Sequence, residues 1–159
     1  MLIRVLFVCL GNICRSPMAE AVFRDLVRKN NLSDKIEVDS AGTGNWHVGN
    51  PPHEGTRKIL EQENISYEGI TARQVSENDW SDFDYIIAMD DDNIAELDKL
   101  KTSDVETAKL MDFVEDAPEE NVPDPYFTGN FDYTYELVSA GCENLLNYII
   151  EKHDLTKES

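Results

Sequence analysis

The sequence predicts an α/β protein with a four-stranded parallel sheet and helices on both of its faces, in three layers. Two observations support this fold. Apolar segments of strand length alternate with helical segments in the order βαβαβαβα. Residues 2–8 are nearly all β-branched or large and apolar, which is typical of a strand covered on both faces. We expect a single domain over residues 1–159, because a chain of 159 residues with 41% hydrophobic content can build one packed core.

The helical segments are those in which apolar residues recur every three or four positions. In the first, Ser16 and Pro17 suit the N-cap and the first helical position. In the third, Asp90 is placed to cap the helix. The four predicted helices are residues 16–30, residues 53–64, residues 90–101 and the chain from Phe131 onward.

Three further segments have the composition of strands, namely residues 36–43, 83–90 and 109–114. The stretch from about Asp116 to Asn130 shows no regular pattern, and long loops in compact domains are often functional. Ligands bind at the carboxyl ends of the strands in open parallel sheets. Residues 9–15, which directly follow the first strand, are therefore the first place to look for a site.

Composition excludes several classes of protein. The formal net charge of −18 disfavours binding to nucleic acid or to an anionic membrane. The apolar start of the chain is short, contains Arg4 and lacks a cleavage site, and no other stretch approaches about 18 apolar residues. Three cysteines do not form a disulfide framework. We expect a soluble cytoplasmic protein.

The string VCLGNICRSP, residues 8–17, joins the first strand to the first helix. Backbone N–H groups of such a loop, together with the dipole of the helix behind it, attract an anion. The loop lacks the Gly-Lys-Ser/Thr ending of an ATP-binding loop. Arg15 is placed to hold two oxygens of a tetrahedral oxyanion, with Cys9 beneath its centre. The positive surroundings favour a thiolate, so Cys9 is a candidate nucleophile towards phosphorus.

VCLGNICRSPMAE resembles the signature of the low-molecular-weight protein tyrosine phosphatases, V-C-x-G-N-x-C-R-S-P. VPDPYF at 122–127 resembles the general-acid loop of that family, and DSAGT, TARQV and FDYIIAMD resemble other family segments in the same order. The resemblance covers nearly the whole chain. It implies the phosphotyrosine protein phosphatase I-like fold and hydrolysis of phosphotyrosine and aryl phosphate monoesters through a cysteinyl-phosphate intermediate. The implied partners are phosphotyrosine-containing proteins, and we expect a monomer or a weak dimer.

The resemblance also implies a role for each matching residue. Cys9 attacks phosphorus, Arg15 holds the equatorial oxygens, and Asp124 protonates the leaving group and then activates water. The Ser16 hydroxyl donates to the Cys9 thiolate, while Asn12 and Ser40 support the loop. No metal or cofactor is needed, because arginine and amide dipoles supply the positive field. The residues expected to bind the phosphate are Leu10, Gly11, Asn12, Ile13, Cys14 and Ser16.

Two further expectations concern redox chemistry and substrate contact. The family resemblance implies that Cys14 forms a disulfide with Cys9 when the nucleophile is oxidised, although a purely packing role for Cys14 is an open alternative. Cys142 belongs to the apolar stripe of the last helix and is expected in the core. Trp46, Tyr126 and Phe127 resemble the aromatic walls around the phenyl ring, with a place at the edge of the core as the alternative.

One position departs from the family pattern. Ile70 stands where many members have a histidine that hydrogen-bonds the loop asparagine, so support for Asn12 must come from Ser40, Ser16 or backbone groups. Three other functions stay open. An arsenate reductase needs two more cysteines in the middle of the chain, yet residues 76–100 contain none. A protein-arginine phosphatase of this fold carries threonine where this chain has Ile13. A phosphate-binding module without turnover would need neither a nucleophile such as Cys9 nor an acid such as Asp124, and this chain has both.

Overall fold

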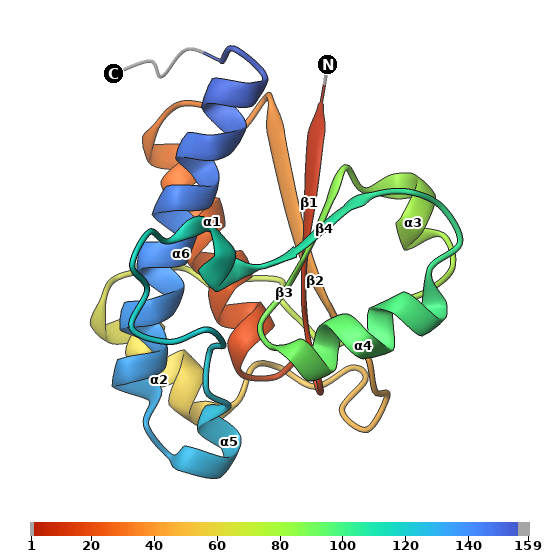
Figure 1. Cartoon of the computed structure of the whole chain (residues 1–159). Coiled ribbons are helices and arrows are strands. Elements are labelled where there is room, and N and C mark those ends of the chain that lie inside the picture. Colours follow the sequence, from red (N-terminus) through yellow and green to blue (C-terminus); the bar gives the residue numbers. More distant parts are fainter. Residues whose placement is uncertain (1, 156–159) are drawn as a thin grey trace.

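The computed structural model describes residues 2–155 and contains a four-stranded parallel sheet in the order β2-β1-β3-β4 (Figure 1). Each pair of neighbouring strands is parallel, as the alternation of elements predicts. The predicted fold class is thereby confirmed. The strands are β1 (Ile3–Cys9), β2 (Ile36–Gly42), β3 (Tyr85–Ala88) and β4 (Glu106–Lys109).

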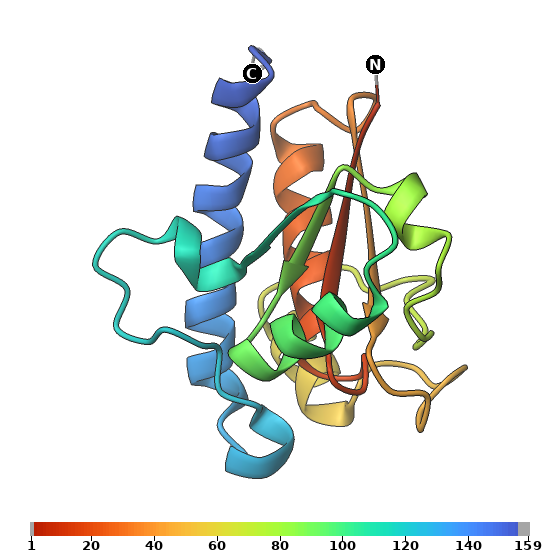
Figure 2. The ribbon, with the colours of Figure 1, turned by 45° about the vertical axis from the view of Figure 1, so that its right-hand side comes forward.

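Helices cover both faces of the sheet (Figure 2). One face carries α1 (Arg15–Lys29), α2 (Glu54–Gln62) and α6 (Phe131–Lys152), and the other carries α3 (Asp79–Asp82) and α4 (Asp91–Leu100). Side chains of a strand point alternately to its two faces. In β1, Val5 and Phe7 accordingly join the core cluster on the α1 side, while Leu6 and Val8 join the cluster that contains Trp80.

The predicted strand at residues 109–114 is wrong. The fourth strand lies earlier, at Glu106–Lys109, and Leu110–Phe113 form a single 3₁₀ turn instead. Leu110 and Met111 are buried in the core cluster with α6, so they are apolar because they pack on a helix. A short apolar run does not distinguish a buried strand from another buried segment, and this is the source of the error.

The predicted start of the first helix, with Ser16 as N-cap and Pro17 as the first helical residue, is also wrong, by two residues. Cys14 occupies the N-cap position of α1 and makes no side-chain cap, and Arg15 is the first helical residue. The Ser16 hydroxyl lies instead among Cys9 and Asn12, where it takes part in the site described below. Two four-residue helices, α3 and α5 (Pro125–Thr128), are too short to show a helical periodicity in the sequence.

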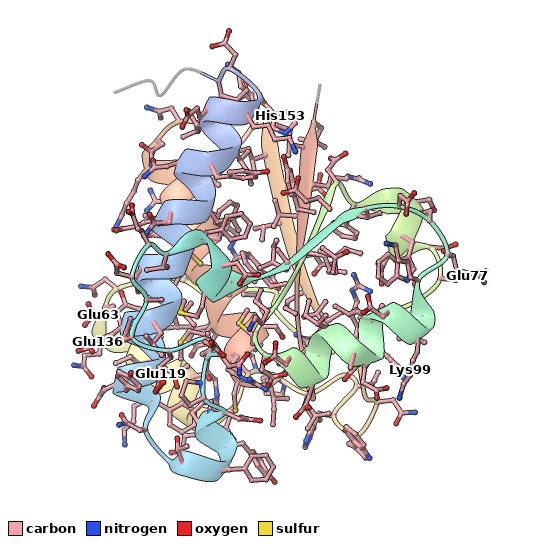
Figure 3. The ribbon with its side chains drawn as sticks, viewed as in Figure 1. Glu63, Glu77, Lys99, Glu119, Glu136 and His153 are labelled. Atoms are coloured by element: carbon pink, nitrogen blue, oxygen red, sulfur yellow. The ribbon has the colours of Figure 1, made fainter. Side chains whose placement is uncertain are left out.

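The two ends of the sheet differ in what they carry. Both described chain ends lie at the amino end of the strands (Figure 1). There, the Tyr85 hydroxyl is 2.7 Å from Nε2 of His153, which lies just beyond the last turn of α6 (Figure 3). The carboxyl ends of β1 and β3 lie at the opposite end and lead into the loops that carry the predicted site. None of the helices in residues 2–155 has the length and apolar composition that a membrane span requires.

Candidate active site

The loop at residues 10–14 joins the end of β1 to the start of α1. Two of its carbonyl groups are bound by neighbouring segments: the N–H of Gly44 donates to the Leu10 oxygen at 2.9 Å, and that of His53 to the Ile13 oxygen at 2.7 Å. The backbone N–H groups of residues 10–14, by contrast, have no acceptor within residues 2–155. A loop with its carbonyls bound outward and its N–H groups free is an anion cradle.

The cradle is packed tightly against the end of β2. A Cβ atom on Gly42 would lie 2.9 Å from the Leu10 oxygen and 3.1 Å from the Asn12 nitrogen. Both contacts are tighter than carbon atoms normally make with backbone, so this strand end requires glycine. The sequence segment DSAGT thus supplies the surface on which the loop rests.

Asn12 adopts a left-handed backbone conformation, with φ of 57°, which asparagine tolerates better than most residues. Its Nδ2 donates to Ser16 Oγ at 2.7 Å and to Ser40 Oγ at 2.9 Å. Its Oδ1 accepts from the backbone N–H of Arg73 at 3.0 Å. Support for Asn12 therefore comes from both serines and a backbone group, as expected for a chain with Ile70 in place of histidine. Ile70 itself is buried in the core.

Arg15 is nearly fully buried and is held from one side. Its Nη1 donates to Asp90 Oδ2 at 2.6 Å and to the carbonyl oxygen of Val122 at 2.8 Å. Nε has no partner within residues 2–155, and Nη2 makes only a 3.4 Å contact with Asp124 Oδ2. Burial alone would lower the pKa of Arg15, but Cys9, Asp90 and Asp124 raise it above its ordinary value. The guanidinium is thus always charged, and Nε with Nη2 forms a fork that suits two oxygens of an anion.

The three cysteines lie in different surroundings. Cys9 Sγ is 3.0 Å from Ser16 Oγ at the base of the loop. Burial, together with the nearby Cys9 and Asp124, raises the pKa of Cys14 to about 12, so this neighbour stays a neutral thiol. Cys142, on α6, is fully buried in the protein core, and burial raises its pKa as well. The prediction that Cys142 is a core residue is confirmed.

Asp124 is placed by the short helix that follows it. It is the N-cap of α5, and its Oδ1 accepts from the Tyr126 N–H at 3.1 Å. Its side chain is one-fifth exposed and lines the same pocket as Cys9. The Asp-Pro dipeptide therefore starts a short helix, and the Asp124 side chain that caps it lies on the pocket wall.

One open pocket of about 240 Å³ contains most of the predicted residues. Trp46, Tyr126 and Phe127 lie on its wall and are 67%, 54% and 75% exposed, so these aromatic side chains do not belong to the core. Arg15, Asn12, Ser16 and Ser40 are buried and do not line the pocket. The pocket is lined by Cys9, Leu10, Gly11, Ile13, Cys14, Trp46, His47, Asp124, Tyr126 and Phe127.

Three residues near the site were not predicted to have these positions. His47 lines the pocket, with its ring centre 6.4 Å from that of Tyr126. His53 caps α2 through Nδ1 and stacks on Phe131 with ring centres 5.1 Å apart. Asp90 was expected only as a helix cap, but it also binds Arg15. No local sequence signal reports contacts between segments so far apart in the chain.

The described residues 2–155 include no group of three or more His, Cys, Asp or Glu side chains arranged to hold a metal ion. The chemistry available at this pocket is that of a thiol, a guanidinium, a carboxyl group and a ring of backbone amides. This set suits nucleophilic attack on a tetrahedral oxyanion with acid catalysis from one side.

Comparisons with known proteins agree with this geometry. The chain is 57% identical to the low molecular weight protein-tyrosine-phosphatase YfkJ of Bacillus subtilis, over 97% of this chain and all of the relative. The crystal structure of YfkJ superposes with a TM-score of 0.93, covering 96% of this chain and 97% of that chain. The low molecular weight protein-tyrosine-phosphatase PtpA of Staphylococcus saprophyticus is 46% identical over 99% of this chain and its own full length.

A solved structure of an arginine phosphatase is also similar. The Drosophila arginine phosphatase DARP is 37% identical, with a TM-score of 0.85 over 91% of this chain and 96% of that chain. The family model described as "Low molecular weight phosphotyrosine protein phosphatase" matches residues 4–158. Because the family model matches nearly the whole chain, and because Cys9, the loop after it and Asp124 line one pocket, the chain belongs to the low molecular weight phosphotyrosine protein phosphatase family.

Proposed function

We propose that this protein hydrolyses phosphotyrosine in proteins through a covalent intermediate on Cys9. The observation that supports this most directly is the position of Cys9 Sγ, at the base of a loop whose N–H groups are free and beside an arginine fork with a free Nε. Asp124 lines the same pocket. The relatives that carry the name protein-tyrosine-phosphatase support the choice of substrate.

In the first step the Cys9 thiolate attacks phosphorus in line, and the bond from phosphorus to the tyrosine oxygen breaks. The leaving phenolate takes its proton from the Asp124 carboxyl group. The amides of residues 10–14 and the Arg15 fork hold the three equatorial oxygens as charge shifts between them. The expected phosphate contacts at Leu10, Gly11, Asn12, Ile13, Cys14 and Ser16 are part of this proposal, and they rest on the position of the loop.

In the second step water attacks the cysteinyl phosphate, and the Asp124 carboxylate takes a proton from that water. The Cys9 sulfur leaves as a thiolate and inorganic phosphate is released. The Ser16 hydroxyl, 3.0 Å from Cys9 Sγ, stabilises the leaving sulfur by donating a hydrogen bond to it.

The experiment that tests this proposal compares wild type with Cys9→Ser on a phosphotyrosine peptide. We expect the variant to be inactive, while the wild type, stopped with acid during turnover of a ³²P-labelled substrate, retains label on Cys9. Turnover by the Cys9→Ser variant, or a labelled residue other than Cys9, would reject the covalent mechanism. A matched Cys142→Ser variant controls for the general effect of losing a thiol.

The competing substrate class is phosphoarginine, which the similarity to DARP raises. Ile13 and Leu10 give this pocket an apolar floor and rim beside three aromatic side chains, which suits a phenyl ring better than a guanidinium. We expect kcat/KM for a phosphotyrosine peptide to exceed that for a matched phosphoarginine peptide by at least about 100-fold. Equal efficiency on the two peptides would reassign the substrate class.

We also propose that Cys14 protects the nucleophile from irreversible oxidation. Peroxide converts the Cys9 thiolate to a sulfenic acid and is itself reduced to water. The Cys14 thiol then attacks that sulfur, and a disulfide forms with loss of a second water. Both cysteines are buried, Cys9 just before the loop and Cys14 at its end, and both line one pocket, which supports the pairing. After peroxide and then dithiothreitol, activity should return in wild type but not in Cys14→Ser; equal recovery would leave Cys14 as a packing residue.

The chemistry of Cys9 also bears on the cellular compartment of the protein. A nucleophilic thiol requires reducing surroundings, so we propose that the protein acts in the cytoplasm on phosphotyrosine-containing proteins, as a monomer or weak dimer. The three free cysteines are consistent with such surroundings.

A further inference from the structure

Behind the catalytic loop, a buried glutamate closes a chain of hydrogen bonds that begins at the nucleophile. Glu20, in the second turn of α1, is 7% exposed and is not part of the pocket wall. Ser40 Oγ lies 2.6 Å from its Oε1. From Ser40 the chain continues through Asn12 and Ser16 to Cys9 Sγ, with every link at 3.0 Å or less.

The direction of every proton in this chain can be assigned by counting donors. The Arg73 backbone N–H donates to Asn12 Oδ1, so the Asn12 amino group must face the two serines. Its two hydrogens then go to Ser16 Oγ and Ser40 Oγ, which makes both serines acceptors. Each serine has one hydroxyl proton left to give.

The two ends of the chain take these protons. The Ser40 proton goes to Glu20 Oε1 at 2.6 Å. The Ser16 proton goes to Cys9 Sγ at 3.0 Å, because the alternative acceptor, the Ala41 carbonyl oxygen, is 3.5 Å away. The same orientation of the Asn12 amide therefore lets Ser40 donate to Glu20 and lets Ser16 donate to Cys9.

Without an acceptor at position 20, the Ser40 hydroxyl group could donate its proton only to Asn12. The amide would then favour the flipped orientation, with its oxygen towards the serines, and the Ser16 proton would be shared with that oxygen. Cys9 would lose its hydrogen bond, and the Arg73 N–H would face an amino group. An unpaired buried polar group of this kind is costly, and each of the two amide orientations would leave one. Asn12 would then populate both orientations instead of one.

We propose that Glu20 is a positioning residue for this phosphatase: by accepting the Ser40 proton it fixes the Asn12 amide and thereby directs the Ser16 proton to the Cys9 sulfur. The inference rests on the proposed role of Cys9 as nucleophile. Ionisable and charged groups around Glu20 are Asp39 from β2, Arg24 from α1 and Arg73 from the segment after residue 70. Burial, which is the largest influence, raises the pKa of Glu20 to about 7, and the carboxyl group keeps an oxygen acceptor for Ser40 in either state.

The test compares two substitutions of similar size. Glu20→Gln keeps an oxygen acceptor for Ser40, whereas Glu20→Met has none. We expect Glu20→Met to lower kcat about tenfold and to slow alkylation of Cys9 by iodoacetamide at pH 7 by a similar factor, because a hydrogen bond to the thiolate is lost. KM should change little, since the pocket wall is intact. Glu20→Gln should retain most of both rates.

A double-mutant cycle with Ser40→Ala separates this role from a general effect on folding. If Glu20 acts through Ser40, the Glu20→Met/Ser40→Ala double variant should be no slower than Ser40→Ala alone. Rate losses that multiply, a Glu20→Met variant with wild-type rates, or a Glu20→Gln variant as slow as Glu20→Met would each overturn the inference. Failure of the proposed covalent mechanism would give a different result: the Cys9→Ser variant of the full chain would stay active.

Discussion

Asp90 uses its two carboxylate oxygens for two different elements. Oδ1 accepts from the Asn93 N–H at 2.8 Å and caps α4, while Oδ2 accepts from Arg15 Nη1 at 2.6 Å. The residue that follows β3 by two positions thus fixes the guanidinium at the start of α1. Because Nη1 is occupied in this way, only Nε and Nη2 remain for the proposed contact with phosphate.

Substitution of Asp90 should therefore affect phosphate binding and helix capping separately. Asp90→Asn keeps a capping oxygen but replaces an ion pair by a weaker neutral hydrogen bond. We expect KM for an aryl phosphate to rise about fivefold to tenfold, with a change in the free energy of unfolding below about 1 kcal/mol. Asp90→Ala should show the same loss of binding plus about 1 kcal/mol of destabilisation from the lost cap. Steady-state kinetics and urea denaturation of both variants check this; an unchanged KM would contradict it.

Asp124→Asn should slow the reaction in a way that depends on the leaving group. The amide cannot supply a proton, so kcat for phenyl phosphate should fall by about 100-fold or more. The loss should be smaller for 4-nitrophenyl phosphate, whose leaving group needs less protonation. Because Asp124 also contacts Arg15 Nη2 at 3.4 Å, an equal loss on both substrates would indicate that it only positions the arginine.

Phe127→Ala tests whether the exposed aromatic wall serves the substrate. The side chain is 75% exposed, so its loss should change the free energy of unfolding by less than about 0.5 kcal/mol. KM for a phosphotyrosine peptide should rise about threefold to tenfold, because an aromatic contact is lost. Val48→Ala, at another exposed apolar position outside the pocket lining, is the matched control and should leave KM unchanged. The same KM in both variants would remove Phe127 from the binding surface.

The buried Glu20 should make stability depend on pH. Its pKa is raised from 4.5 to about 7 in the folded protein, mainly by burial and in smaller part by Asp39. The folded state therefore binds more protons than the unfolded state between these values, and the stabilising contribution is complete below about pH 4.5 and lost as pH rises through 7.

Glu20→Gln removes this titration, since glutamine does not ionise. From pH 5 to pH 8 the free energy of unfolding of wild type should fall relative to that of the variant by about 1 to 3 kcal/mol. Urea denaturation of the two proteins at a series of pH values measures the difference. A difference that is constant over this range would show that Glu20 is already ionised at pH 5.

Local pattern was sufficient for part of this molecule. The apolar run in β1 and the helical periodicity of α1 and α6 predicted the layered sheet, because burial on one or two faces leaves a direct trace in the order of residues. Leu110–Phe113 has the apolar composition of a strand but forms a 3₁₀ turn, because its apolar residues pack on α6 and do not pair in the sheet. Its partner is a helix that starts 18 residues after the turn ends, and no local pattern encodes that distance.

The site divides in the same way. The sequence by itself predicted the loop, because a strand, a loop of fixed length and a helix start bring Cys9 and Arg15 to its two ends. Only the tertiary structure decided what holds them: Asp90 on Arg15, Arg73 on Asn12 and Glu20 on Ser40. Each of these contacts joins residues that are not neighbours in the chain, and the hydrogen bonds exist only once the core has brought their strands and helices together.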